Sequence, residues 1–184
     1  MKSFRSVVLV FVCGLDSLFN MIRITLLLMV FGFLSSGAKP IEVGADAPQL
    51  SVTKSDGEEL ELATVYAAGP TLVYFYPKAD TPGCTAQACN LRDSFEELTD
   101  TGIQVLGVST DKVKDQAAFK EKYSLPFTLI ADPDQVLVKA FGVPTRVGFA
   151  SRQSFLVVDG KIAWRDLSAS PKTQAKDALA ALSE

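Results

Sequence analysis

Apolar and polar positions divide the chain into two parts that meet near residue 38. Residues 1–38 are apolar with few charges, whereas residues 39–184 alternate short apolar runs with amphipathic stretches. The run TLVYFY at residues 71–76 is β-branched and aromatic throughout, which is typical of a strand in the middle of a sheet. Alternating residues on either side of Asp56-Gly57 and Asp159-Gly160 predict two β-hairpins.

The rest of the pattern predicts strands and helices in alternation. Strands are expected at 103–109 and 127–131, and helices at 84–99, 112–123 and 136–141, with a final helix opening at Ser170-Pro171. Such alternation indicates βαβ units with parallel strands. The sequence therefore predicts a single α/β domain with a thioredoxin-like fold over residues 39–184, in which helices cover both faces of a central mixed sheet.

The amino-terminal part has the layout of an export signal. Its apolar runs, residues 7–15 and 24–34, fall short of the roughly 20 residues that span a bilayer. Arg23, the second run and the small residues 36–38 match the charged start, apolar centre and cleavage site of a signal peptide, with Met21 as a natural start. We expect export to the bacterial periplasm after cleavage. The alternative is an uncleaved membrane anchor, and only then would the protein contact a membrane.

Composition narrows the chemistry further. The chain has 18 Lys and Arg against 21 Asp and Glu, a formal charge of -3 and no basic cluster, which argues against nucleic-acid binding. It has three cysteines and no histidine, which excludes Ser-His-Asp and Cys-His catalysis and HExxH zinc sites. A nucleophile in this protein must therefore be activated without an imidazole.

Candidate chemistry lies between the predicted buried strand and the following helix. Thr81 can cap that helix with Pro82 at its first position, which places Cys84 among the unpaired N–H groups of the first turn. The helix dipole there also favours a thiolate, the reactive form of cysteine. Lowering a thiol pKa from about 8.5 by two units takes about 2.7 kcal/mol. A helix terminus contributes only about 0.3 to 1 kcal/mol, so a cation is also needed.

Arg152 is the candidate cation, because it stands directly before the buried strand SFLVV and could project beside the loop. Its guanidinium keeps its charge and offers a fork of donors that can hold a thiolate and orient a peroxide oxygen. Lys78 and Arg146 are the competing basic residues, both in predicted loops. The Thr81 hydroxyl can donate and accept during such a reaction, although it could also serve only as an N-cap.

The pattern of Pro77, Thr81 and Cys84, followed by Cys89 and Arg152, resembles the AhpC/TSA-like peroxiredoxins. The segment FYPKADTPGCTAQACNLRD is especially similar to the bacterioferritin-comigratory, or Q-type, branch, and the resemblance extends over about residues 41–182. It implies an enzyme that reduces hydrogen peroxide and organic hydroperoxides without a metal or other cofactor.

The same resemblance assigns roles to the five residues. Cys84 corresponds to the peroxidatic cysteine and Cys89 to the resolving cysteine, Thr81 and Arg152 activate peroxide and thiolate, and Pro77 shields the pocket. A thioredoxin-type protein would then reduce the disulfide. We expect a monomer, with a dimer as the alternative.

The spacing of the two cysteines has a geometric consequence. Five residues on an ideal helix rotate by about 500° and rise 7.5 Å, which puts the two Cα atoms roughly 8 to 9 Å apart. A disulfide tolerates about 7 Å at most, so the helix must unwind locally before Cys84 and Cys89 can bond. A permanent structural disulfide is the alternative for an exported protein.

Two other functions are compatible with a cysteine on this fold. A thiol-disulfide oxidoreductase on the same fold would be expected to carry a CxxC motif, which this sequence lacks. A non-catalytic interaction domain would make Cys84 incidental. Gln87, one turn beyond Cys84, is either a hydrogen-bond partner in the site or a solvated residue.

Overall fold

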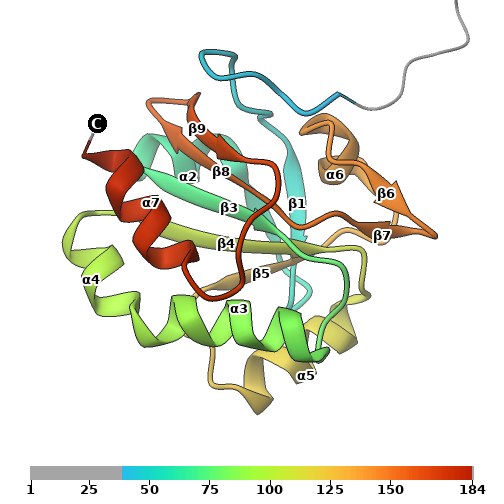
Figure 1. Ribbon diagram of the computed structural model, residues 1–184. Helices are drawn as coiled ribbons and strands as arrows, with labels where there is room; N and C mark the ends of the chain where they lie inside the picture. The colour runs from blue at the N-terminus through green and yellow to red at the C-terminus, as the bar shows by residue number, and fades with distance from the viewer. Residues whose placement is uncertain (1–38, 184) are drawn as a thin grey trace, which may run out of the picture. The chain divides into compact units, whose positions relative to one another are not determined.

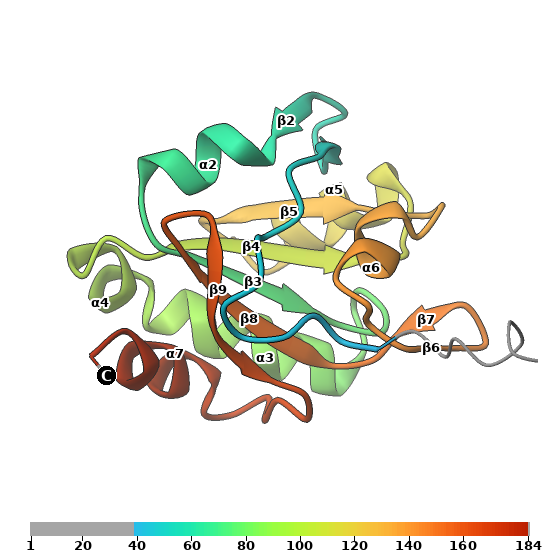
Figure 2. The ribbon, with the colours of Figure 1, turned by 90° about the horizontal axis from the view of Figure 1, so that it is seen from above.

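A seven-stranded mixed sheet organises residues 39–183, the part of the chain that the computed structural model describes. Its three middle strands are parallel and its other neighbours are antiparallel (Figures 1 and 2). The predicted leader, residues 1–38, lies outside the described residues, with Cys13 and Met21. The order across the sheet is β2 (Glu59–Glu61), β1 (Ser51–Lys54), β5 (Thr128–Ala131), β4 (Gln104–Ser109), β3 (Thr71–Phe75), β8 (Gln153–Val158) and β9 (Lys161–Asp166).

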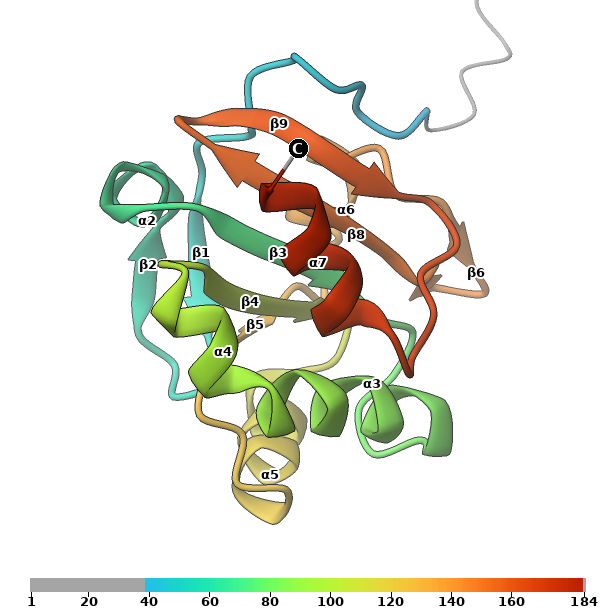
Figure 3. The same cartoon turned by 60° about the vertical axis from the view of Figure 1, so that its left-hand side comes forward.

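Helices cover both faces of this sheet, as the sequence predicts. One face carries α3 (Pro82–Asp93), α4 (Phe95–Asp100), α5 (Val113–Lys122) and α7 (Gln174–Leu182), and the other carries α2 (Leu62–Ala68) and α6 (Val136–Ala140). In Figure 3 the carboxy-terminal helix α7 lies in front of the sheet, next to α3, and the two helices are in contact. No helix among residues 39–183 has both the length and the apolar character needed to cross a membrane.

Strand β3 explains why the two faces form separate cores. Its side chains alternate, so that Leu72 and Tyr74 join the core under α3 while Val73 and Phe75 join the core under α6. All of its residues are buried, which is the burial expected of a central strand. The predicted apolar run is therefore confirmed as the centre of the sheet.

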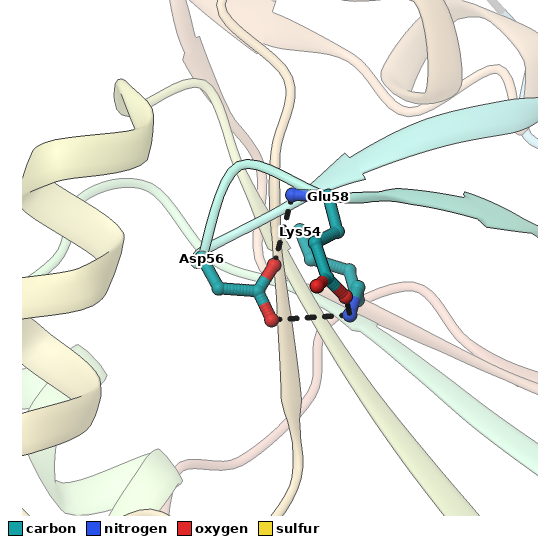
Figure 4. A network of polar contacts seen from close by, with 3 residues as sticks. All are labelled: Lys54, Asp56 and Glu58. Carbon is teal, nitrogen blue, oxygen red and sulfur yellow. Dashed lines mark hydrogen bonds and ion pairs between the residues drawn. The ribbon is translucent and has the colours of Figure 1, made fainter.

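The turn between β1 and β2 confirms the first predicted hairpin. Asp56 Oδ1 accepts a hydrogen bond of 3.0 Å from the Glu58 N–H, and Lys54 Nζ reaches the carboxylates of Asp56 at 3.0 Å and Glu58 at 2.6 Å (Figure 4). Gly57 has a φ of 87°, a left-handed conformation that a glycine adopts without strain. These contacts close the turn at the exposed β2 edge.

The structure differs from the sequence-based prediction in four elements. The helix predicted at 84–99 is two helices, because α3 ends at Asp93 and the chain turns at Ser94 before α4. Helix α2 was not predicted because its seven residues are too short for a clear periodicity. The final helix begins at Gln174, after turns in the segment that follows Ser170. The short hairpin β6 (Thr145–Arg146) and β7 (Phe149–Ala150) was also missed.

Residues 39–47, the first described residues, run along the outer edge of the sheet as a strap. The Gly44 N–H donates to the Ile162 carbonyl at 2.8 Å, and the Ile162 N–H donates to Ala45 at 2.9 Å. The Ala47 N–H donates to Gly160 at 2.8 Å. The strap thus covers part of the edge of β9, which would otherwise offer unpaired backbone groups to another chain.

Candidate active site

Three elements converge at one end of β3. The strand leads through residues 76–81 into α3, and its antiparallel partner β8 begins at the same end, since Phe75 pairs with Gln153. Arg152, the residue before β8, is therefore held beside the start of α3. The sequence predicted this convergence for Arg152, and the sheet register is its physical cause.

Cys84 is the third residue of α3 and is only 2% exposed. Thr81 occupies the N-cap position and Pro82 the first helical position, as predicted. The Thr81 side chain, however, makes no capping bond, because its hydroxyl donates to the Lys78 carbonyl at 2.9 Å. The N–H groups of the first turn near the sulfur are thus not occupied by the cap, and the lone pairs of Thr81 Oγ1 stay available to accept a proton donor.

The Arg152 guanidinium completes the surroundings of the sulfur. Its Nη2 lies 3.4 Å from Cys84 Sγ, and its Nη1 donates a hydrogen bond to Gln87 Oε1. Gly83 leaves room for this approach, because a Cβ there would lie 3.3 Å from Nη2. A permanent cation and a helix start thus face one buried thiol, and both attract negative charge.

The loop that carries Thr81 is fixed from the side of α5. The Ala79 N–H donates to Asp111 Oδ2 at 2.7 Å, and the Asp80 carboxylate accepts from Lys122 Nζ at 2.7 Å and from the Tyr123 hydroxyl at 2.6 Å. The Lys122 ammonium, and then the Tyr123 hydroxyl, hold the pKa of Asp80 below its ordinary value. The loop conformation is therefore set before any substrate binds.

The other predicted residues lie around this centre. Cys89 is half-buried further along α3, and the thiols of Cys84 and Cys89 are both free. Pro77 is half-buried directly after β3. Of the competing cations, Lys78 Nζ lies 5.7 Å from the centre of the Phe149 ring, and Arg146 is exposed on β6. Arg152 differs from Lys78 and Arg146 in its contact with Cys84.

Sequence reasoning missed several polar residues that support the site. Gln174 and Ser154 are buried and connect to Gln87 by hydrogen bonds, and Asp111 anchors the loop. The one available signal was the position of Gln174, which precedes the buried Ala175 on the inner side of the last helix. A single polar residue beside an apolar stripe is too weak a pattern to suggest a role.

This arrangement of a buried thiol, an arginine and a helix start agrees with the comparisons to known proteins. The model of the AhpC/TSA family matches residues 43–165. The chain belongs to the AhpC/TSA family. Peroxiredoxin Bcp of Escherichia coli strain K12 is 46% identical over 131 residues, which cover 67% of this chain and 83% of that protein.

Solved structures support the same assignment to the AhpC/TSA family. The crystal structure of peroxidoxin BcpB from Mycobacterium tuberculosis has a TM-score of 0.73 at 30% identity, and the match covers 78% of this chain and 97% of that one. The bacterioferritin comigratory protein of Xanthomonas campestris has a TM-score of 0.70 at 29% identity, covering 79% and 96%. The predicted thioredoxin-like fold and Bcp/peroxiredoxin Q branch are confirmed, and the chain is a thiol-dependent peroxidase.

Proposed function

We propose that Cys84 is the peroxidatic cysteine and that Cys89 resolves it through an intramolecular disulfide. The observation that carries this assignment is the 3.4 Å contact between Cys84 Sγ and Arg152 Nη2 at the start of α3. The guanidinium stabilises the thiolate and can also hold the incoming peroxide. Pro77 and the loop before α3 limit the access of water.

In the first step the Cys84 thiolate attacks one oxygen of the hydroperoxide. A sulfur–oxygen bond forms and the peroxide oxygen–oxygen bond breaks, so that sulfur is oxidised to a sulfenic acid. The departing hydroxide or alkoxide takes up a proton and leaves as water or alcohol. The Thr81 hydroxyl can accept a hydrogen bond from the peroxide, which orients the oxygen that is attacked.

In the second step the Cys89 thiol condenses with the sulfenic acid. A disulfide forms and water leaves. Because an ideal helix keeps residues five apart roughly 8 to 9 Å from each other, α3 must open between Cys84 and Cys89 for this step. A dithiol protein of the thioredoxin type then reduces the disulfide by thiol exchange and becomes oxidised itself.

Hydroperoxides of small size fit the site best. Cys84 is 2% exposed, which admits a small peroxide more readily than the disulfide of a folded protein. The bacterioferritin comigratory protein of Xanthomonas campestris is described by its alkyl peroxide reduction activity, and we propose organic hydroperoxides along with hydrogen peroxide for this chain. Direct exchange with protein disulfides is disfavoured by the same burial.

Stopped-flow measurement of peroxide loss tests these roles. Cys84→Ser should abolish the reaction, and Cys89→Ser should react once and then stall unless an external thiol is added. Arg152→Ala should slow the first step at least tenfold, since a hydrogen bond to a charged group contributes about 1.5 to 3 kcal/mol. Undiminished peroxidase activity in Cys84→Ser would rule out the assignment.

Amide exchange tests the opening of α3. Residues 82–92 should exchange faster in the disulfide form than in the reduced form, because the first turns are unwound when the sulfurs are bonded. Peroxide-treated Cys89→Ser is the control, since it cannot form the disulfide and should keep the protection of the reduced form. Equal protection in all three samples would contradict the opening.

We further propose that residues 1–38 direct export and are removed as a signal peptide. The charged start at Arg23, the apolar run and the small residues before Lys39 support this proposal. Amino-terminal sequencing of the exported protein should find Lys39 first. Recovery of the full-length chain in the membrane fraction would favour the anchor instead.

A further inference from the structure

A row of four polar side chains runs from the active site into the core between α3, α7 and the sheet. Arg152 Nη1 donates to Gln87 Oε1, Gln87 Nε2 donates to Gln174 Oε1, and Gln174 Nε2 donates to Ser154 Oγ. Gln87 and Ser154 are 0% exposed and Gln174 is 1% exposed. The three bonds of the row join residues that are 65, 87 and 20 positions apart in the sequence.

The direction of every bond in the row follows from its arginine end. A guanidinium can only donate, so Gln87 must turn its carbonyl oxygen toward Arg152. Its amide nitrogen then faces Gln174, which must in turn present an oxygen and direct its own nitrogen at Ser154. Aligned bonds of this kind polarise one another in a low-dielectric interior. The far end of the row thus helps to fix the orientation of the cation at Cys84.

The row also crosses the segment that must open. Gln87 lies between Cys84 and Cys89, so unwinding there pulls its side chain away from Gln174. A second contact joins the same helices, because the Ala175 N–H donates to Asn90 Oδ1 at 3.1 Å. The contact between Asp80 and Lys122 lies outside the segment from Cys84 to Cys89, so the opening does not have to break it. The opening thus has to release contacts with α7.

We propose that Gln174 is a positioning residue that holds Gln87, and through it Arg152, in the geometry that activates Cys84. The same bond restrains α3, so that its release is linked to disulfide formation. Loss of Gln174 should therefore have two opposite effects, a slower reaction with peroxide and a faster condensation with Cys89. The inference rests on the proposed role of Arg152.

Gln174→Met removes the polar end of the side chain and keeps its length. We expect the first step with hydrogen peroxide to slow by about tenfold, the size of a lost hydrogen bond in a charged network. The thiolate absorbance of Cys84 at neutral pH should fall and the pH profile of the first step should move to higher pH. The rate of disulfide formation, followed by tryptophan fluorescence of Trp164, should rise.

Asn90→Ala is the matched control, because it removes the other bond between α3 and α7 without touching the row. It should speed disulfide formation and leave the first step and its pH profile as in the wild type. Ser154→Ala is a milder second variant that removes only the last acceptor of the row, and it should shift the pH profile in the same direction as Gln174→Met. Circular dichroism of each variant establishes that it is folded.

The outcomes separate this inference from the proposed function. The inference would be overturned if Gln174→Met or Ser154→Ala kept the wild-type rate and pH profile of the first step while Arg152→Ala changed both. Equal slowing in Asn90→Ala would also overturn it, because loosened helix packing would then account for the effect. If Arg152→Ala itself keeps the wild-type profile, the proposed role of Arg152 fails and the inference fails with it.

Discussion

At the scale of single residues, the site depends on small side chains as much as on charged ones. Gly83 stands in the first turn of α3, where its missing Cβ leaves the Arg152 guanidinium free to reach Cys84. In the proposed mechanism the Cys84 thiolate needs this contact, because the helix start alone supplies about 0.3 to 1 kcal/mol of anion stabilisation. Glycine at position 83 therefore lowers the stability of the helix but allows the Arg152 guanidinium to approach Cys84.

Gly83→Ala should move stability and activity in opposite directions. Alanine favours a helix over glycine by about 0.5 to 1 kcal/mol, so the free energy of unfolding should rise in a urea titration. The new Cβ, 3.3 Å from Arg152 Nη2, is closer than an ordinary contact, so the guanidinium must shift by a few tenths of an ångström, which should slow the first step by roughly threefold or more.

Ala86→Gly is the control for this substitution. Ala86 is exposed on the same helix, so glycine there should lower the free energy of unfolding by up to about 1 kcal/mol and leave the first step unchanged. A Gly83→Ala enzyme as fast as the wild type would contradict the steric role given to Gly83.

At the scale of elements, α3 is held at both ends by the carboxy-terminal end of α5, through Lys122 and the following Tyr123. The Asp80 carboxylate before α3 accepts from Lys122 Nζ and the Tyr123 hydroxyl, and Arg92 Nη1 near its end donates to the Tyr123 carbonyl at 2.9 Å. These two anchors limit any opening of the helix to the residues between them, which include both cysteines. The surrounding fold can then stay intact during the redox cycle.

The Asp80 anchor should be lost in acid. Contact with Lys122 lowers the pKa of Asp80 in the folded state, so the ion pair stabilises the fold above the ordinary aspartate value of about 3.9. This stabilisation disappears as the pH falls through the lowered folded value. Asp80→Asn should thus melt below the wild type at pH 7, and the difference should shrink below about pH 4. Asparagine tolerates the left-handed φ of 57° at this position.

Glu121→Gln is a suitable comparison, since Glu121 is an exposed acid on α5 that forms no ion pair within residues 39–183. Its melting temperature should follow the wild type more closely over the same pH range. Differences of equal size in both variants would show that the Asp80 contact has no special role.

Element boundaries near the site were only partly predictable from the sequence. Thr81 and Pro82 mark the start of α3 because capping and proline preferences are local properties of the chain. Its end at Asp93 was not predicted, since apolar residues continue to Leu98 and only packing decides that the chain turns at Ser94. The hydrogen bond from the Thr81 hydroxyl to the Lys78 carbonyl was likewise not predictable, because the conformation of the loop determines it.

At the scale of the whole described unit, the strap of residues 39–47 is part of the fold. Besides its bonds to β9, the Ile41 N–H donates to the Phe141 carbonyl at 3.0 Å, and Arg165 Nη1 donates to the Pro40 and Ile41 carbonyls at 3.1 and 2.8 Å. Gly142 permits this packing, because a Cβ there would lie 2.0 Å from the Lys39 carbonyl oxygen.

Alanine substitutions at two glycines separate the effect of a collision with the strap from the effect of backbone strain. Gly142 and Gly148 both have left-handed φ angles, 65° and 83°, so alanine at either costs about 1 to 2 kcal/mol. Only Gly142→Ala also collides with the strap, whereas a Cβ at Gly148 has nothing within 4 Å. Gly142→Ala should therefore unfold at lower urea and exchange its Ile41 amide faster. Identical urea midpoints for the two variants would contradict a contribution of the strap to the stability of the fold.

The sequence by itself determined the central strand, the βαβ order, the start of α3 and the place of Cys84 in its first turn, because these depend on local preferences and on residue types. It also selected Arg152, whose place directly before a buried strand is a local signal. Only the tertiary structure decided that Gln87, Gln174 and Ser154 form one row, since they lie on α3, α7 and β8. Hydrogen bonds between distant segments leave no periodic trace in a sequence, and packing alone brings their partners together.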